Sequence, residues 1–408
     1  MRPYALIDLH CDTLTDCMYA GSNIIDTLDD PARTLSLTSI PKDIHWAQFF
    51  AVFVPDELRG EKAIRFFDDA CANFDRQMRK FADRVSPCRN VADMERAWAA
   101  GKTAAFLSVE NGSAFAGDLS RIGKTKRQGV CAVTLTWNGE NELGSGNVTD
   151  RGLTDFGRAA VREMERCGIL IDVSHLNDAG LADVFETAER PFLATHSNAR
   201  AICAHKRNLT DVQIKEMVRR GCLIGLNYYG PFLRDGGAVR SLDDVYRHVA
   251  HFFDLGARKN LALGSDFDGA VLPPCLDSPE KAADFYEYLL LRGVSQQDAD
   301  GIFFENARTF LRKTLGERKT LGSGRRTVIQ SIKTGEGSTW QKNRAATPRR
   351  ASSRRRGSSF TSRAMRRRQW RRSSSSRRRR RARSTTILTA RTRCSRPSRC
   401  CLTSGMRS

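Results

Sequence analysis

The sequence has 408 residues, a length that one barrel-shaped enzyme domain can use, and a formal net charge of +21. The charge is uneven, because Arg318 to Ser408 hold 29 of the 67 Lys and Arg residues and one of the 46 acidic residues. The first 317 residues therefore carry 38 basic and 45 acidic residues and are mildly acidic. The positive net charge of the whole chain is thus no evidence that this part binds nucleic acid.

Cysteine usage and hydropathy indicate a soluble protein with reduced thiols. Nine of the twelve cysteines are scattered singly before residue 318, often inside apolar runs, and no CxxC pair occurs. The N-terminal MRPYALIDLHCDTL does not read as a signal peptide, and no window reaches the roughly 18 apolar residues of a membrane span. We therefore expect a cytoplasmic protein with no membrane partner.

Short apolar segments rich in β-branched residues alternate with segments of helical periodicity. The eight predicted strands are Tyr4–Leu9, Ala47–Val54, Ala104–Ser108, Val130–Thr136, Gly168–Val173, Phe192–Thr195, Cys222–Asn227 and Leu261–Ser265. Between them, patterns such as GRAAVREMERCG and LTDVQIKEMVRRG predict amphipathic helices that end at a glycine. Eight such units predict a (β/α)8 TIM barrel; an open doubly wound sheet is the alternative, and the lack of G-x-G-x-x-G after the first strand disfavours it.

The chain changes character after a last predicted helix, Glu305 to Lys319. We therefore divide it into a barrel domain, 1–319, and an Arg- and Ser-rich low-complexity tail, 320–408, which cannot bury a core. Three interpretations of the tail are open: a solvated disordered segment, an arm that binds nucleic acid, and a non-native out-of-frame translation. The last would explain why Arg so greatly outnumbers Lys there.

Side chains that bind metals follow several of the predicted strands. LIDLHCDTL holds His10 and Asp12, which lie two apart and so point to the same face of a strand. SVENG, DVSH and ATHSN place Glu110, His175 and His196 after three further strands, and in a barrel all these ends meet at one face. A single histidine is more often a hydrogen-bonded structural residue than a ligand. The set of five predicts a site for Zn²⁺ or a similar ion, with a carboxylate that can bridge two ions about 3.5–4 Å apart.

Two further segments complete a predicted hydrolytic site. LALGSDFDG ends the last strand with Asp266 and Asp268, and a free carboxylate there is suited to move a proton between water and a leaving amine. The alternative is an aspartate that caps the turn. Arg207, in HKRNLTD, is suited to bind a substrate carboxylate through paired hydrogen bonds, the alternative being an ordinary surface arginine.

Taken together, IDLHCDT, SVENG, LTLTWN, GLTDFG, IDVSH, HSNAR, RNLTD and GSDFDG resemble the membrane dipeptidase (renal dipeptidase) family of binuclear zinc peptidases. The resemblance covers roughly Tyr4 to Leu315, with the motifs in the family order. It implies a (β/α)8 barrel, two zinc ions per chain and hydrolysis of dipeptides by metal-activated hydroxide. Some members accept a D-residue at the C-terminal position.

The resemblance also assigns roles to individual residues. The implied metal ligands are two pairs joined by one bridging carboxylate: His10 and Asp12, His175 and His196, and Glu110 between them. Asp266 would be the acid/base, and Arg207 would hold the terminal carboxylate of the dipeptide.

The chain departs from the family after the LTLT segment. Animal members have a histidine there that contacts the substrate and helps to stabilise the tetrahedral intermediate, whereas this chain has Trp137 followed by Asn138. We expect Asn138 to bind substrate, because its amide can donate a hydrogen bond to an oxyanion. Trp137 either contacts the substrate or packs in the wall of the site.

Two other functions stay open at this stage. One is a related barrel amidohydrolase that acts on another amide or on a lactone, and the other is nucleic-acid binding through the basic tail. The apparent use of Glu110 as a bridge and the position of Arg207 favour the dipeptidase, with a small dipeptide as partner. We also consider a homodimer as the assembly of this protein.

Overall fold

The structure is a computed structural model, and it describes residues 2–15 and 28–316. The tail, 320–408, lies outside the described residues, so the three interpretations of it stay predictions. The predicted last helix is described as far as Leu315.

Within the described residues nine parallel strands form the sheet: β1 (Ala5–Cys11), β2 (His45–Phe53), β3 (Val85–Cys88), β4 (Thr103–Glu110), β5 (Val130–Thr134), β6 (Leu170–Asp172), β7 (Leu193–Ala194), β8 (Leu223–Leu226) and β9 (Leu261–Leu263). Strand β2 pairs with β1 on one side and with β4 on the other, which closes a ring of eight strands in the order β1-β2-β4-β5-β6-β7-β8-β9. The predicted (β/α)8 barrel is therefore confirmed.

Strand β3 was not predicted. It pairs with the first half of β4, from Thr103 to Phe106, while β5 pairs with the second half, from Leu107 to Glu110. Its four residues, VSPC, are few and include a proline, so neither length nor apolar pattern marks them as a strand. The strand extends the sheet beside the ring without entering it.

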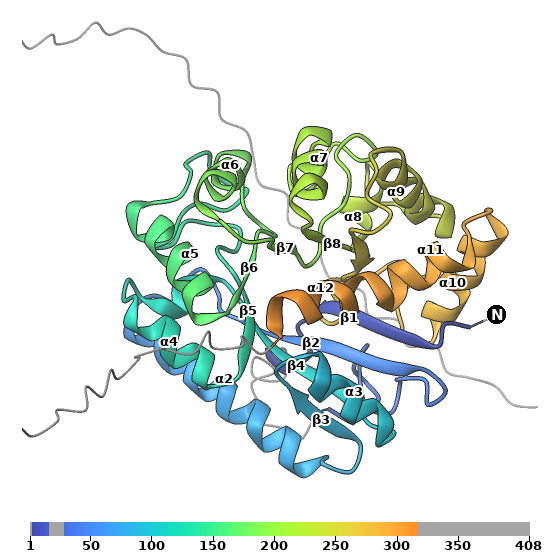
Figure 1. The fold of residues 1–408 in the computed structure, drawn as a ribbon, viewed down its shortest axis with the longest axis horizontal. Helices are drawn as coiled ribbons and strands as arrows, with labels where there is room; N and C mark the ends of the chain where they lie inside the picture. The colour runs from blue at the N-terminus through green and yellow to red at the C-terminus, as the bar shows by residue number, and fades with distance from the viewer. Residues whose placement is uncertain (1, 16–27, 317–408) are drawn as a thin grey trace, which may run out of the picture. The chain divides into compact units, whose positions relative to one another are not determined.

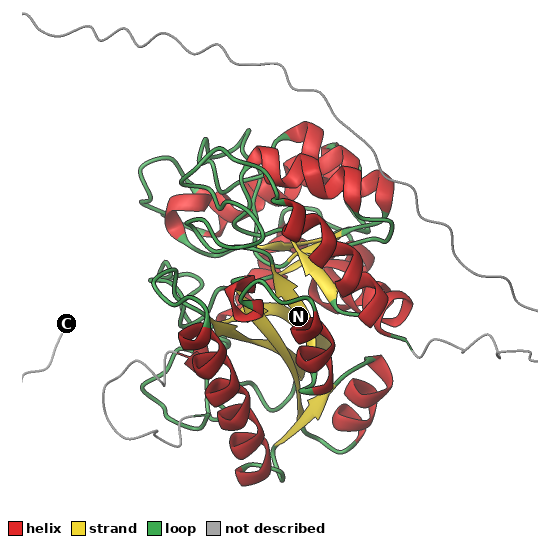
Figure 2. Cartoon of the chain, turned by 90° about the vertical axis from the view of Figure 1, so that its left-hand side faces the viewer, coloured by secondary structure: helices red, strands yellow, loops and turns green. Residues whose placement is uncertain are grey.

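The helices of the described residues surround the strands, as Figures 1 and 2 show. Their bounds are α2 (Glu61–Lys80), α3 (Val91–Ala99), α4 (Ser120–Arg127), α5 (Asp155–Cys167), α6 (Asp178–Thr187), α7 (Asp211–Arg220), α8 (Gly230–Leu233), α9 (Leu242–Asp254), α10 (Lys281–Leu291), α11 (Gln296–Asp300) and α12 (Asn306–Leu315). Two short segments are a 3-10 helix, η1 (Gly112–Phe115), and a π-helix, η2 (Gly301–Glu305).

Local sequence explains where α5 and α7, two of the predicted helices, begin and end. Thr154 and Thr210 accept hydrogen bonds from backbone N–H groups in the first turns of α5 and α7. Both helices end at a glycine in the left-handed region, Gly168 at φ 71° and Gly221 at φ 70°. These caps fix the point at which the chain returns to the barrel as β6 and β8.

The strands bury their side chains on both faces, as expected where a parallel sheet is covered by helices. Inside the ring, Phe49 of β2 stacks on Phe106 of β4 with 4.7 Å between ring centroids. Six of the eight described cysteines are buried, which agrees with the predicted free thiols. Within the described ranges, no helix combines the length and apolar composition of a membrane span.

Candidate active site

The predicted metal ligands meet at the C-terminal mouth of the barrel. His10 is the penultimate residue of β1, Glu110 is the last residue of β4, and His196 follows β7 by two residues. Asp12 follows β1 directly, and His175 follows β6 by three residues. Because all strands are parallel, these ends converge, and the five side chains are buried together.

The carboxylate of Glu110 lies at the centre of the cluster. One of its oxygens, Oε1, is 2.7 Å from His175 Nε2 and 3.8 Å from His196 Nε2. The other, Oε2, is 3.6 Å from His10 Nε2. A carboxylate with one oxygen toward each side has the arrangement of a bridging ligand.

The nitrogens that His175 and His196 direct at each other are both acceptors. His175 Nδ1 donates to Asn138 Oδ1 at 3.1 Å, since that oxygen is a carbonyl and cannot donate. His196 Nδ1 donates to Thr195 Oγ1 at 2.8 Å, because the hydroxyl gives its own hydrogen to Asp172. The two Nε2 lone pairs then face each other across 2.9 Å. The two lone pairs repel each other, and a metal cation bound by both nitrogens would remove this repulsion.

Other atoms of the cluster also lack protein partners. Within the described part of the chain, His10 Nε2 and Asp12 Oδ1 are buried without a hydrogen bond, although His10 Nε2 lies 3.4 Å from Asp12 Oδ2. A Cβ on Gly269 would come within 2.1 Å of Asp12 Oδ2, so glycine keeps the space beside this carboxylate open. Imidazole nitrogens and carboxylate oxygens in a buried group are the donor set of a divalent metal, and the residues therefore fit one.

Burial and neighbouring charges shift the pKa values of the clustered side chains in different directions. Burial disfavours the charged form of His10, but Asp12 and Glu110 outweigh it and raise the pKa of this histidine well above its usual value. Burial and the nearby Glu110 carboxylate raise the pKa of Asp12 to about 7. Burial and the neighbouring cations hold the pKa of His196 well below 6.5, so this ring is neutral and able to ligate.

The two aspartates after β9 have different surroundings. Asp268 accepts hydrogen bonds from Thr13 Oγ1 at 2.6 Å and from the backbone N–H of Thr34 at 2.8 Å, so it ties loops together. Asp266 accepts from Asn227 Nδ2 at 3.0 Å through one oxygen and directs the other to within 3.8 Å of His10 Nε2. The free carboxylate expected in this segment is therefore Asp266.

Backbone strain is concentrated here. Of the five described non-glycine residues with positive φ, three are His175 at 71°, Asp266 at 67° and Asp268 at 63°. Such conformations cost on the order of 1–3 kcal/mol each and persist where the surroundings enforce them, often at functional sites.

Arg207 is a buried guanidinium with unused donors. Its side chain lies over the ring of Phe232 at 5.2 Å, and its Nε and one terminal nitrogen have no hydrogen-bond partner among the described residues. Burial lowers the pKa of Arg207 to about 10, against the opposing effect of Asp266 and Glu110. A buried unpaired cation is costly, so the site is prepared for an anionic group of a ligand.

Trp137 and Asn138 lie on the other side of the cluster. The Trp137 ring packs edge-on against Phe53 at 4.9 Å and lies 6.3 Å from the ring of His175. Asn138 Oδ1 holds His175 and also accepts from Asn147 Nδ2 at 2.6 Å. Trp137 therefore packs against Phe53 beside the cluster, and Asn138 orients a predicted metal ligand.

A cavity of about 470 Å³ opens over these groups. It is lined by Asp12, Glu110, His175 and Asp266 together with aromatic residues that sequence reasoning did not identify as site residues: Phe53, Tyr229 and Phe232. Phe53 ends β2 and the other two follow β8, but an aromatic residue at the end of a strand is equally typical of core packing, so no signal distinguished them.

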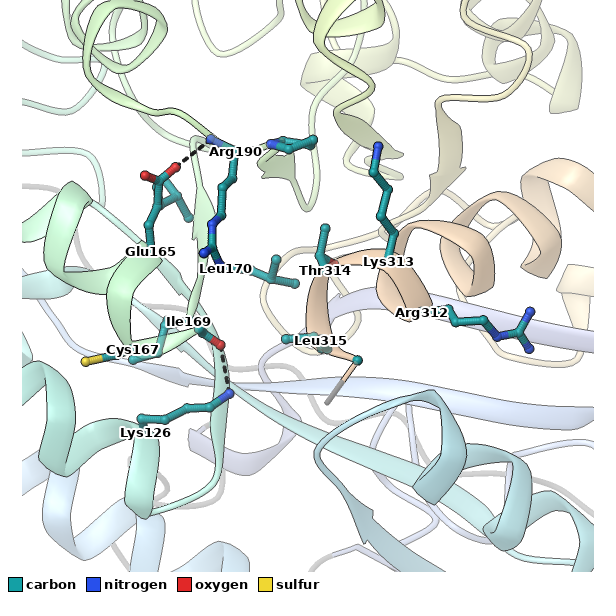
Figure 3. A pocket seen from close by; sticks show the side chains of 14 residues that line it. Lys126, Glu165, Cys167, Ile169, Leu170, Arg190, Arg312, Lys313, Thr314 and Leu315 are labelled. Carbon is teal, nitrogen blue, oxygen red and sulfur yellow. Dashed lines mark hydrogen bonds between the residues drawn. The ribbon is translucent and has the colours of Figure 1, made fainter. Parts of the chain in front are cut away.

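A second cavity, of about 530 Å³, lies at the opposite end of β6 and is shown in Figure 3. Two of its charged side chains form hydrogen bonds to the backbone next to helix ends. Lys126 Nζ donates to the carbonyl of Gly168 at 2.8 Å, and Glu165 accepts from the backbone N–H of Arg190 at 2.8 Å. Arg312, in the last turn of α12, pairs with Glu95. Its lining residues include no histidine, so the catalytic candidate is the cavity at the C-terminal mouth.

A closed (β/α)8 barrel with histidines and carboxylates at its C-terminal mouth defines a metal-dependent barrel hydrolase. The comparisons with known proteins make this specific. The sequence model of the membrane dipeptidase family, peptidase family M19, matches residues 1–320. The chain belongs to this family and is a metal-dependent dipeptidase, a hydrolase that acts on peptide bonds.

Individual relatives agree with the family. An uncharacterised protein encoded in the pqqA 5′ region of Klebsiella pneumoniae is 31% identical over 236 residues, which cover 55% of this chain and 87% of that protein. The crystal structure of a metallo peptidase from Rhodobacter sphaeroides, liganded with a phosphinate mimic of the dipeptide L-Ala-D-Ala, is 26% identical with a TM-score of 0.73. That match covers 76% of this chain and 99% of the other. A structure of dipeptidase AC, a metallo peptidase of family M19, is 26% identical with a TM-score of 0.72 and covers 77% of this chain and all of the other.

Proposed function

We propose that the chain hydrolyses free dipeptides with two zinc ions and accepts a D-residue at the C-terminal position. The observation that carries the proposal is Arg207, a buried guanidinium with two nitrogens that no described residue pairs with, near enough to Asp266 and Glu110 for their charges to affect its pKa. A free dipeptide has a terminal carboxylate one residue from its scissile bond, so the same molecule can neutralise Arg207 and reach the cluster. The L-Ala-D-Ala mimic in the Rhodobacter sphaeroides metallo peptidase supports the choice of stereochemistry.

The ligands divide between two ions as the resemblance implies. In this proposal His10 and Asp12 would hold one ion and His175 and His196 the other. Glu110, which has one carboxylate oxygen toward His10 and one toward His175 and His196, would join them. When bound, zinc ions polarise the scissile carbonyl and make water a nucleophile near neutral pH.

Asp266 handles the proton in this proposal. Asn227 holds one of its oxygens, and the other faces the metal-binding cluster. From there the carboxylate takes the proton of the attacking water and gives it to the departing amine nitrogen. Asn227 keeps the carboxylate oriented during both transfers.

The runner-up is a barrel hydrolase that acts on another amide or on a lactone. Such substrates can lack a free carboxylate, and they would leave Arg207 buried and unpaired. A dipeptide substrate would supply the carboxylate that pairs with Arg207, and for that reason we prefer the dipeptidase.

A substrate screen with matched compounds tests the proposal. Zinc-loaded protein is assayed with L-Ala-L-Ala, L-Ala-D-Ala, L-Ala-L-Ala amide and a lactone, and bound metal is counted per chain. We expect two zinc ions, hydrolysis of both free dipeptides, weak activity on the amide, and loss with a chelator that added zinc reverses. Lactone hydrolysis without dipeptide hydrolysis would overturn the proposal, and cleavage of only the L,L-dipeptide would remove its stereochemical part.

A further inference from the structure

Two aromatic pairs form opposite walls of the active-site cavity. Phe53 and Trp137 meet edge-to-face with ring centroids 4.9 Å apart, and Tyr229 and Phe232 do the same at the same distance. All four side chains line the cavity. Phe53 ends β2 and Trp137 follows β5, the two strands beside β4, whereas Tyr229 and Phe232 follow β8. In the ring of eight strands β8 stands opposite β4, so the pairs face each other across the mouth.

Arg207 gives these two walls different roles. Its guanidinium lies over the ring of Phe232. Because Arg207 binds the terminal carboxylate in the proposed function, that function puts the carboxylate end of the dipeptide at the Tyr229–Phe232 wall. Glu110 and His175 line the same cavity and belong to the cluster that acts on the scissile bond in the proposed function. The side chain of the first residue then points to the Phe53–Trp137 wall.

The chemistry of that wall is apolar. A phenyl and an indole ring present large hydrophobic faces, with one indole N–H as the polar group that the rings supply. The nearby carboxylate of Asp56 is engaged, because it accepts from the backbone N–H of Gly139 at 2.7 Å and from Asn111 Nδ2 at 3.1 Å. It is therefore poorly placed to pair with a cationic side chain.

We infer that Phe53 and Trp137 select the first residue of the dipeptide and favour a large apolar or aromatic side chain there. The inference rests on the proposed function and deepens it. It also gives Trp137 a role of its own at the position where the family resemblance leads one to expect a histidine: an apolar surface of the specificity pocket.

The test compares four substrates with a common second residue: Ala-Ala, Leu-Ala, Phe-Ala and Lys-Ala. In the zinc-loaded protein we expect kcat/KM for Leu-Ala and Phe-Ala to exceed that for Ala-Ala and Lys-Ala by roughly tenfold or more. Trp137→Ala should reduce the preference to within about threefold, and Trp137→Phe should keep most of it. As a matched control on the opposite wall, Phe232→Leu should change all four values by a similar factor, because it faces the shared alanine.

The outcomes separate the two proposals. If the zinc-loaded protein cleaves none of the four dipeptides, the proposed function fails. If it cleaves all four equally well, or if Trp137→Ala lowers all four values by the same factor, the function stands and this inference is overturned. Should Trp137→Ala not fold, as judged by circular dichroism, Phe53→Leu tests the same wall by the same ratio.

Discussion

At the scale of single residues, the site depends on which nitrogen of each histidine carries the proton. The buried Asp172 accepts from Thr195 Oγ1 at 2.6 Å, which obliges Thr195 to accept from His196 Nδ1 and leaves Nε2 as the ligating atom. Thr195→Val keeps the shape but removes the hydroxyl. We expect it to lower zinc affinity roughly 10- to 100-fold, whereas Thr195→Ser stays near the wild type. Competition with a chromophoric chelator measures both, and unchanged affinity in Thr195→Val contradicts the assignment.

We expect Asp266 to transfer a proton during catalysis and not to be required for metal binding. Asp266→Asn keeps the side-chain size and removes the ability to accept a proton. Because general acid–base catalysis contributes roughly 10²–10⁴-fold, we expect kcat to fall by that factor while the zinc content stays the same. Metal analysis and steady-state kinetics on the same sample decide it. A variant with full turnover would rule out the proton-transfer role.

Arg207 makes a prediction about binding. Arg207→Ala removes the cation that pairs with the substrate carboxylate, and the loss of such a buried pair costs about 2 kcal/mol or more, or roughly 30-fold in kcat/KM. Most of the effect should fall on KM. The dipeptide amide, which has no carboxylate, serves as the control and should lose much less. Equal losses for the two substrates would show that Arg207 acts only through packing.

At the scale of secondary structure, a buried histidine joins α9 to the loop that follows His196. His248 Nδ1 accepts from the backbone N–H of Ala199 at 3.1 Å, and its Nε2 donates to the carbonyl of Leu233 at 2.9 Å. Both bonds need the neutral ring. Burial lowers the pKa of His248 from 6.5 to about 4.

This shift predicts the pH dependence of stability. Between pH 6.5 and pH 4 the unfolded chain binds the proton at this position and the folded protein does not, so stability falls as the pH falls through this window. The contribution is up to about 3 kcal/mol and is fully present above pH 6.5. His248→Gln does not titrate, and its free energy of unfolding should fall less steeply with acid. Urea denaturation at several pH values measures this, and identical slopes would refute it.

The elements that the sequence reveals are those with local signals. Each predicted barrel strand is present, because apolar runs and terminal glycines such as Gly168 are written in adjacent residues. His10 and Glu110 were predicted as site residues for the same reason, since each comes at the end of such a run. The contact between Asp172 and Thr195 and the facing aromatic walls escape this reasoning, because they join segments that only barrel closure brings together.

At the scale of the whole molecule, closure of the barrel assembles the site from both ends of the domain. The backbone N–H of Asp266 donates to the carbonyl of His10 at 3.2 Å, which holds the first and last barrel strands together directly beneath the metal-binding cluster. The site is therefore a property of the closed ring, and damage to the seam between β1 and β9 should affect catalysis and stability together.

The last prediction concerns the division of the chain. The family match ends at residue 320, and the charge of the sequence changes sign at about the same point, so catalysis should belong to residues 1–319. Protein truncated after Lys319 should keep zinc-dependent dipeptide hydrolysis with kcat/KM within about twofold of the full chain, because every predicted site residue precedes the tail and physiological salt weakens long-range effects of charge. The full chain should bind DNA in a salt-dependent way that the truncated protein lacks, as counterion release by clustered arginines requires. Loss of dipeptidase activity on truncation would place part of the catalytic unit in the tail, and DNA binding by the truncated protein would place the basic surface on the barrel.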